Sequence, residues 1–149
     1  MSLKAQIDND IKQAMLAKDK EKLEALRGIK SLILLAETDK NNTGEISSET
    51  ENKLLMKAAK QRKESAEIFQ KEGREDLAKR ELFQYEIIRA YLPKQLSEEE
   101  LKKKLQGIIE KVGATGPQDL GKVMGIATKE LAGKADGKMI ADLVKKLLS

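Results

Sequence analysis

Apolar side chains recur at intervals of three and four residues along almost the whole chain, and this spacing limits most strongly what the chain can fold into. Leu3, Ile7 and Ile11 form one such stripe, and Leu26 and Ile29 belong to the next. Each stripe predicts an amphipathic helix that turns its apolar side toward a core. Aromatic residues, which favour strands, make up only 3% of the sequence, so an extended sheet is not expected. The sequence therefore predicts an all-α protein.

A proline closes the group formed by the first four predicted helices. Turn-forming residues between positions 39 and 46 separate the second helix from the third, and Ser48–Glu51 fits a capping box at the start of the third. Gly73 supplies the stop after that helix. The fourth helix carries apolar residues on more than one face, which predicts burial on two sides. It ends at Pro93, because the residue before a proline is pushed out of the helical region. We predict a four-helix N-terminal domain over residues 1–93.

Three further helices are predicted after this proline. Ser97–Glu100 fits a second capping box, and Gly113 ends the helix that begins there. Pro117 stands where the next helix can start, and Asp136 caps the last one. We predict a small three-helix C-terminal domain over residues 97–149.

The residue types that are missing restrict the chemistry. The chain has no cysteine and no histidine, which excludes cysteine-based zinc sites and catalytic triads that need histidine. We expect no cofactor and no metal. The N-terminus has no apolar core of signal-peptide length, and no run approaches the roughly 20 apolar residues of a membrane span. These features predict a cytoplasmic protein that does not associate with membranes.

The charge balance is only mildly basic. Lysine and arginine number 29 against 25 acidic residues, a net charge of +4. The region from residue 97 onward has 10 basic and 8 acidic residues, so no polybasic tail exists. A surface of mixed lysine and glutamate is more often a solvated helical face than a nucleic-acid footprint. Charge alone is weak evidence for nucleic acid.

A glycine-rich stretch is the most unusual local feature. Gly121 and Gly125 lie four residues apart on a predicted helix, so they share one face. An interior helical glycine costs about 0.8–1.0 kcal/mol relative to alanine, which suggests that something comes close to this backbone. Two explanations stay open: tight packing against a neighbouring helix, or the approach of a ligand backbone. Under the second, Lys122, Lys134 and Lys138 would converge beside the N-terminus of the last helix and form an anion site.

Several segments in order along the chain closely resemble the GatB/YqeY family, in particular its small stand-alone YqeY-type members. The motifs that carry this resemblance are Arg62–Ser65, Phe69, Gly73–Leu77, Tyr91–Ser97, Gly121–Gly125 and Gly133–Gly137. The resemblance implies an all-helical N-terminal domain and a three-helix tail similar to the C-terminal domain of the tRNA-dependent amidotransferase B subunit. In that enzyme the tail contacts tRNA, and the amide-forming chemistry sits in other domains.

The resemblance therefore implies a tRNA-binding or amidotransferase-associated accessory protein. Its candidate nucleic-acid-binding residues here are Gly121, Lys122, Gly125, Lys134 and Lys138. The chain shows no phosphate loop, glutaminase nucleophile or metal cluster, so we assign no catalytic residue. Two alternatives stay open: a helical adaptor for another protein, including a translation-related one, and a carbon–nitrogen ligase that takes its amido group from glutamine. We expect no DNA partner.

A second basic surface is also a candidate. Arg62 and Lys63 lie on the third predicted helix, and Arg74 follows the glycine that ends it. The simpler interpretation of the first two is a solvated helix side, and that of Arg74 is a residue at a helix boundary. Contact with a phosphate or carboxylate is the alternative.

Overall fold

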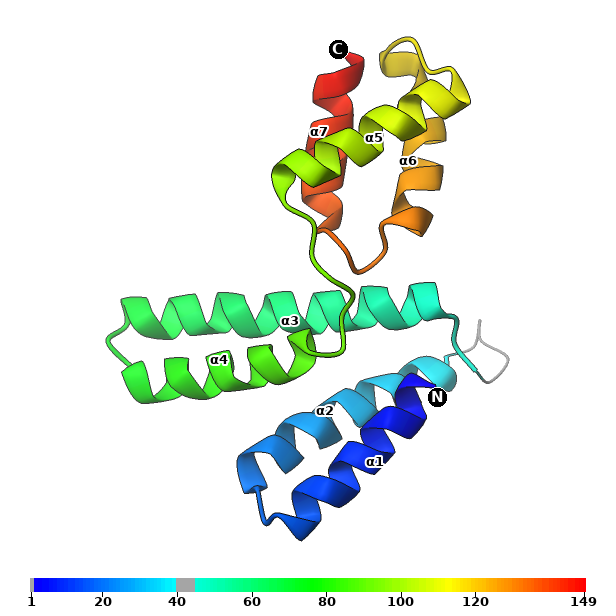
Figure 1. Cartoon of the computed structure of the whole chain (residues 1–149). Coiled ribbons are helices and arrows are strands. Elements are labelled where there is room, and N and C mark those ends of the chain that lie inside the picture. Colours follow the sequence, from blue (N-terminus) through cyan, green and yellow to red (C-terminus); the bar gives the residue numbers. More distant parts are fainter. Residues whose placement is uncertain (1, 40–44) are drawn as a thin grey trace. The chain divides into compact units, whose positions relative to one another are not determined.

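The computed structural model describes residues 2–39 and 45–149, and all regular structure in these ranges is helical (Figure 1). Within these two ranges there are seven α-helices, one short 3₁₀ turn and no strand. The all-α prediction is confirmed. Most of the turn predicted between positions 39 and 46 lies outside the described residues. By their contacts the helices group into two compact units, Met1–Leu92 and Pro93–Ser149.

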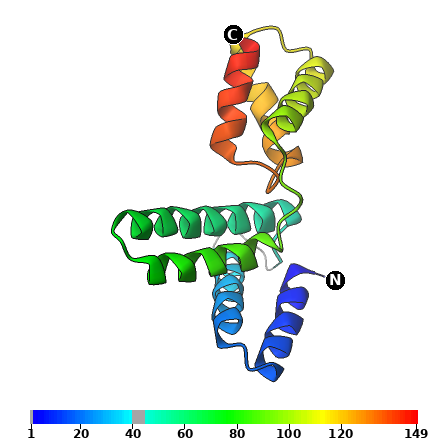
Figure 2. The same ribbon diagram turned by 60° about the vertical axis from the view of Figure 1, so that its left-hand side comes forward.

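The first unit is built from two antiparallel helix pairs. Helix α1 packs against α2, and α3 packs along α4 (Figures 1 and 2). Isoleucine and leucine side chains from α1, α2 and α3 form its core together with alanines of α3 and Ile88 of α4. The bounds are α1 Leu3–Leu16, α2 Lys20–Glu37, α3 Ser48–Lys71 and α4 Glu75–Arg89.

Three details of this unit differ from the prediction. The cap of α3 is Ser47, whose hydroxyl accepts from the Thr50 amide at 3.2 Å. The cap therefore lies one residue before the predicted Ser48, with a single cap in place of the predicted box. Helix α4 ends at Arg89, before the proline. The amides of residues 91 and 92 donate to the carbonyls three residues earlier, at 88 and 89, which is the 3₁₀ pattern and not the α-helical one. Leu82, which the prediction placed on a buried face of α4, is exposed, although α4 packs against both α3 and α2.

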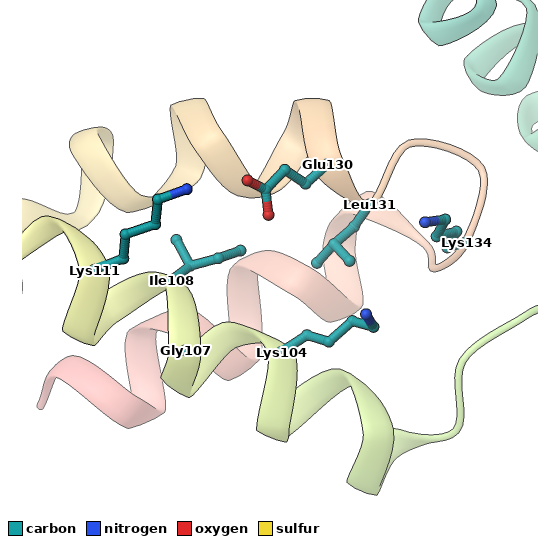
Figure 3. A pocket seen from close by; sticks show the side chains of 7 residues that line it. All are labelled: Lys104, Gly107, Ile108, Lys111, Glu130, Leu131 and Lys134. Carbon is teal, nitrogen blue, oxygen red and sulfur yellow. The ribbon is translucent and has the colours of Figure 1, made fainter.

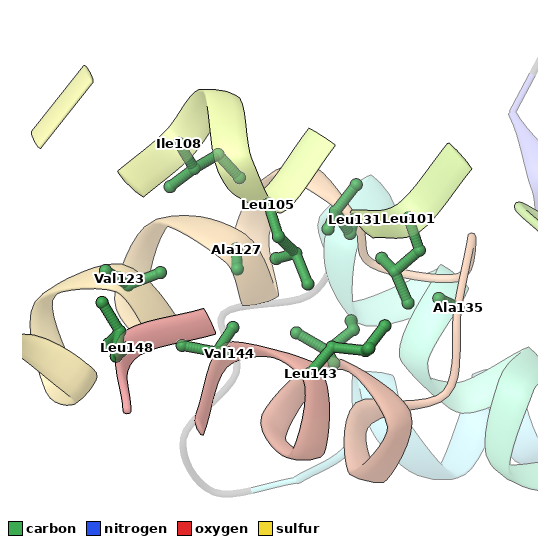
Figure 4. Close-up of a cluster of buried hydrophobic side chains, with 11 residues drawn as sticks. Leu101, Leu105, Ile108, Val123, Ala127, Leu131, Ala135, Leu143, Val144 and Leu148 are labelled. Carbon is green, nitrogen blue, oxygen red and sulfur yellow. The ribbon is translucent and has the colours of Figure 1, made fainter. Parts of the chain in front are cut away.

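The second unit is a three-helix bundle with its own apolar core (Figure 4). Each helix contributes residues spaced by three and four positions, as expected for a face turned inward. The bounds are α5 Glu98–Val112, the 3₁₀ turn η1 Pro117–Asp119, α6 Leu120–Glu130 and α7 Gly137–Leu148. The buried residues are Leu101, Leu105, Ile108, Val123, Ala127, Leu131, Ala135, Ile140, Leu143, Val144 and Leu148.

The ends of α5 follow the sequence prediction. The Glu100 amide donates to the Ser97 hydroxyl at 3.2 Å, and the Ser97 amide donates to the Glu100 carboxylate at 3.3 Å. This capping box is confirmed, and its hydrogen bonds lower the pKa of Glu100. Gly113 ends the helix in the left-handed region at φ 69°, a conformation that glycine adopts without strain.

The segment before α5 is tied to the turn between α6 and α7. The side-chain amide of Gln95 donates to the Gly133 carbonyl at 2.5 Å, and the Leu96 amide donates to the Lys134 carbonyl at 2.9 Å. Gly133 has φ 78°, which lets the chain reverse there. These bonds fix the position of Lys134 beside α5.

Candidate nucleic-acid interface

The two glycines of α6 face solvent. Gly121 and Gly125 are both exposed, while Val123 and Ala127 of the same helix are buried. A Cβ atom built on either glycine would meet no other atom within 4 Å. Tight packing against a neighbouring helix therefore does not explain these glycines. Of the two explanations that the sequence left open, the approach of a ligand from outside the unit remains.

Two lysines lie on the same exposed side of α6. Lys122 and Lys129 fall within about 100° of the glycines around the helix axis. We call the exposed surface of Gly121, Lys122, Gly125 and Lys129 the α6 strip. Its backbone is bare at two points, and its two ammonium groups lie seven residues apart. Such a surface can approach an anionic backbone closely and supply opposite charge.

Lys134 lies apart from this strip, in a groove between α5 and the far end of α6 (Figure 3). The groove has a volume of about 440 Å³. Figure 3 shows Lys111 and Glu130 reaching into it from opposite helices, and Lys104 extending toward the turn that holds Lys134. We call it the α5 groove. Its lining residues are Lys104, Gly107, Ile108, Lys111, Glu130, Leu131 and Lys134.

Lys138 borders a different depression. It lies in the first turn of α7, and its neighbours in this depression of about 320 Å³ include Glu98, Asp136 and Asp142. Lys134 and Lys138 therefore line two separate depressions, and Lys122 lines neither. The structure instead joins Lys134 with two lysines of α5 that the sequence analysis did not single out. The signal that could have found them is their spacing, i and i+7, with a glycine between.

Each member of the second basic surface has a partner within the first unit. Arg62 joins α3 to α4 through Glu81, whose two carboxylate oxygens lie 3.1 and 3.4 Å from one guanidinium nitrogen. This cation has a structural role, which favours the simpler interpretation of the surface. The other two contacts are Lys63 Nζ at 5.9 Å from the centre of the Tyr85 ring and Arg74 Nε at 3.9 Å from Asp76.

The most perturbed titratable group also has a structural role. The Tyr91 hydroxyl donates to the carboxylate of Asp10, joining the end of the first unit to α1. Burial raises the pKa of Tyr91, and the Asp10 carboxylate raises it further. The phenol is therefore protonated at neutral pH and does not act as a base. Among residues 2–39 and 45–149, no group of three or more acidic side chains is arranged to hold a metal ion.

None of the helices described is both long enough and apolar enough to cross a membrane.

A family model described as "Yqey-like protein" matches residues 4–148. Among curated relatives, a protein of Clavispora lusitaniae is 37% identical over 110 residues, and one of Lachancea thermotolerans is 33% identical over 115 residues. These alignments cover 70% and 76% of the chain and 61% of each relative. An Eremothecium gossypii protein is 33% identical over 88 residues, 59% of the chain and 48% of the relative. The chain thus spans less than two thirds of these relatives.

All three relatives carry the name "Altered inheritance of mitochondria protein 41, mitochondrial". The mitochondrial names of these relatives contradict the predicted cytoplasmic location, so that prediction is wrong. The prediction rested on missing features, chiefly the lack of an apolar leader. A chain without such a leader is not confined to the cytosol, since other targeting segments are amphipathic and charged.

Proposed function

Because this chain belongs to the YqeY-like protein family, we propose that it is an accessory protein whose C-terminal unit binds tRNA. The family resemblance relates this unit to the C-terminal domain of the tRNA-dependent amidotransferase B subunit, which contacts tRNA in that enzyme. The unit provides a compact bundle with its own core, a scaffold on which surface residues are held rigidly. The proposal assigns it the binding role alone.

The observation that carries this proposal is the α6 strip. Gly125, in the interior of α6, disfavours the helix by about 0.8–1.0 kcal/mol relative to alanine. Neither Gly125 nor Gly121, in the first turn, is needed for packing inside the unit. A ligand that approaches the bare backbone accounts for them. Lys122 and Lys129 flank that backbone, so the ligand is expected to be anionic.

The composition of the unit indicates how it would recognise RNA. It has 10 lysines and no arginine or aromatic residue after position 97. Base stacking and bidentate base recognition are therefore not expected. Binding by shape and by phosphate contacts fits these residues, and it makes affinity fall as salt rises.

A charge-reversal experiment tests the proposal. The full chain is titrated into fluorescein-labelled tRNA at low salt, and binding is followed by fluorescence anisotropy. Replacing Lys122 and Lys129 of the α6 strip together by glutamate should strongly weaken binding. The matched control replaces two exposed lysines of the first unit, Lys12 and Lys79, and should retain most of the affinity. Undetectable binding by the unaltered chain at low salt would contradict the proposal.

The purified chain is proposed to lack ligase activity of its own. Amide formation on charged tRNA needs an activated carboxyl group and a source of ammonia, and no residue is assigned to either step. An assay with ATP, glutamine and charged tRNA should give no amide. Product formation by the chain alone would move the carbon–nitrogen ligase alternative to first place.

A protein adaptor is the second candidate, and exposed apolar side chains favour it. Met15 and Leu16 at the end of α1 are 55% and 74% exposed, and Leu35 of α2 is 70% exposed. Adjoining exposed apolar residues, such as Met15 and Leu16, can mark a protein contact, and Leu35 lies at the opposite end of the α1–α2 pair. Replacing all three by serine should abolish capture of a defined protein partner and leave tRNA binding unchanged. Capture that survives the replacement would show that these three residues do not form the contact.

We also propose that residues 1–93 and 97–149 are separate folding domains. Limited proteolysis tests this division: the first cuts should fall between residues 92 and 98, and both fragments should persist. Cuts within the α3 or α4 helices before any cut there would contradict it.

A further inference from the structure

The side chains that line the α5 groove have a net positive charge. Three lysines and one glutamate line it, which gives 3 − 1 = +2. Among the described residues, no ion pair involves Lys104, Lys111 or Lys134, although the charge of Lys104 also acts on Glu100, one turn earlier in α5. Like charges gathered in one depression repel one another. An anion in the groove would relieve that repulsion.

The groove has a bare point between two of these lysines. Lys104, Gly107 and Lys111 occupy positions i, i+3 and i+7 of α5, which places them along one face of the helix. Gly107 is exposed, and a Cβ atom built on it would meet nothing within 4 Å. As in the α6 strip, no contact inside the unit requires a glycine here. Glycine lowers the stability of the helix, and this again favours a ligand that approaches the backbone closely at this point.

The same spacing recurs on the next helix. Lys122, Gly125 and Lys129 of α6 repeat the order lysine, glycine, lysine at i, i+3 and i+7, and an isoleucine follows the glycine in both helices. In each case the two lysines are about 10 Å apart along the helix axis. The recurrence indicates that both helices present one kind of contact surface.

We propose that the α5 groove is a second phosphate-contact surface, which holds the sugar–phosphate backbone of the RNA bound by this unit. The inference rests on the proposed function and adds the groove to the α6 strip. Lys104 and Lys111 contact phosphates, and the open backbone at Gly107 lets the strand lie close. Ile108 and Leu131, which complete the lining, offer no side-chain donor or acceptor to a base edge. The groove therefore recognises the backbone without reading sequence.

Glu130 opposes this binding from within the groove. Its carboxylate reaches in from α6 (Figure 3) and is in no ion pair among the described residues. A phosphate that enters the groove meets this charge as well as the three cations. Removing the carboxylate should therefore strengthen RNA binding. A residue with only a structural role would not give this gain.

The test measures tRNA affinity of the full chain as a function of salt. Lys104→Gln removes one groove cation, and Lys102→Gln is its control, since Lys102 is an exposed lysine of the same helix that does not line the groove. We expect Lys104→Gln to lower the slope of log affinity against log salt by about 1, with no change for Lys102→Gln. Glu130→Gln should raise affinity. Gly107→Leu should lower affinity while the helix content stays the same.

The outcomes separate this inference from the proposed function. If the unaltered chain binds tRNA and Lys104→Gln behaves like Lys102→Gln, the groove is refuted and the proposed function stands. If the unaltered chain does not bind tRNA at low salt, the proposed function fails and the groove with it. An acidic peptide that competes with tRNA for the unaltered chain but not for the Lys104→Gln variant would confirm that the groove takes anions. If Glu130→Gln lowers affinity, the electrostatic account of the groove is wrong.

Discussion

Substituting Gly125 separates stability from binding. This glycine lies in the interior of α6, is exposed, and leaves open space where a Cβ atom would stand. Alanine there should stabilise the C-terminal unit by about 0.8–1.0 kcal/mol, because it restricts the unfolded chain and favours the helix. For a domain of this size, that corresponds to a rise in Tm of about 4–8 °C. A leucine at the same position keeps the helix propensity and covers the bare backbone.

Calorimetry and tRNA titration of the same variants give the two readouts. Gly125→Ala should raise the Tm of the C-terminal unit, and Gly125→Leu should weaken tRNA binding by about tenfold, which is 1.4 kcal/mol. Gly28 of α2 provides the control, since it is also exposed and has nothing within 4 Å of a built Cβ atom. Gly28→Leu should leave tRNA affinity unchanged.

Two results would contradict the role given to Gly125. If Gly125→Ala lowers the stability of the unit, the space beside the glycine is not open. If Gly125→Leu binds tRNA as well as Gly28→Leu does, the α6 strip is not a contact surface, and its glycines need another explanation.

Other predictions concern residues that stabilise each unit from within. Ser97→Ala should destabilise the C-terminal unit by about 1 kcal/mol in denaturant titration, and Leu105→Ala by about 2–5 kcal/mol because a fully buried side chain is lost. Because the pKa of Glu100 is lowered, its carboxylate stabilises the folded state above pH 4.5, and this stabilisation is lost as the pH falls through the lowered pKa. Acid unfolding of Glu100→Gln should show a weaker dependence in this range, and an unchanged profile would contradict it. Because the pKa of Tyr91 is raised, the protonated phenol stabilises the folded state at pH 10 and below, and this stabilisation is lost as the pH rises further. Asp10→Asn should lower the pKa of Tyr91 toward its ordinary value of 10, as followed by ultraviolet absorbance.

The helix ends that depend on neighbouring residues could be predicted from the sequence. Ser97 and Glu100 supply both halves of a capping box three residues apart, so the start of α5 needs no distant contact. The start of α3 was predicted one residue late. Position 50, three residues after the cap at Ser47, is a threonine, so the reciprocal bond of a box has no carboxylate to make it.

The candidate site could be predicted only in part. Gly121, Lys122 and Gly125 share a face because helical spacing alone determines it. The α5 groove was missed because it depends on the turn that carries Lys134, which hydrogen bonds from residues 95 and 96 hold beside α5. Lys104 looks in the sequence like any lysine of a solvated helix face. Only the folded turn shows that it shares a groove with cations from elsewhere.

In the proposed binding mode the C-terminal unit meets tRNA at its exposed helical glycines, and the amides of these glycines report on that contact directly. The chain has ten glycines, so a ¹⁵N-glycine-labelled sample gives a simple two-dimensional NMR spectrum. On titration with tRNA at low salt, we predict that the amide signals of Gly107, Gly121 and Gly125 shift or broaden first, while those of Gly28 and Gly73 stay in place. A spectrum in which the glycines of the first unit respond and those three do not would contradict the account.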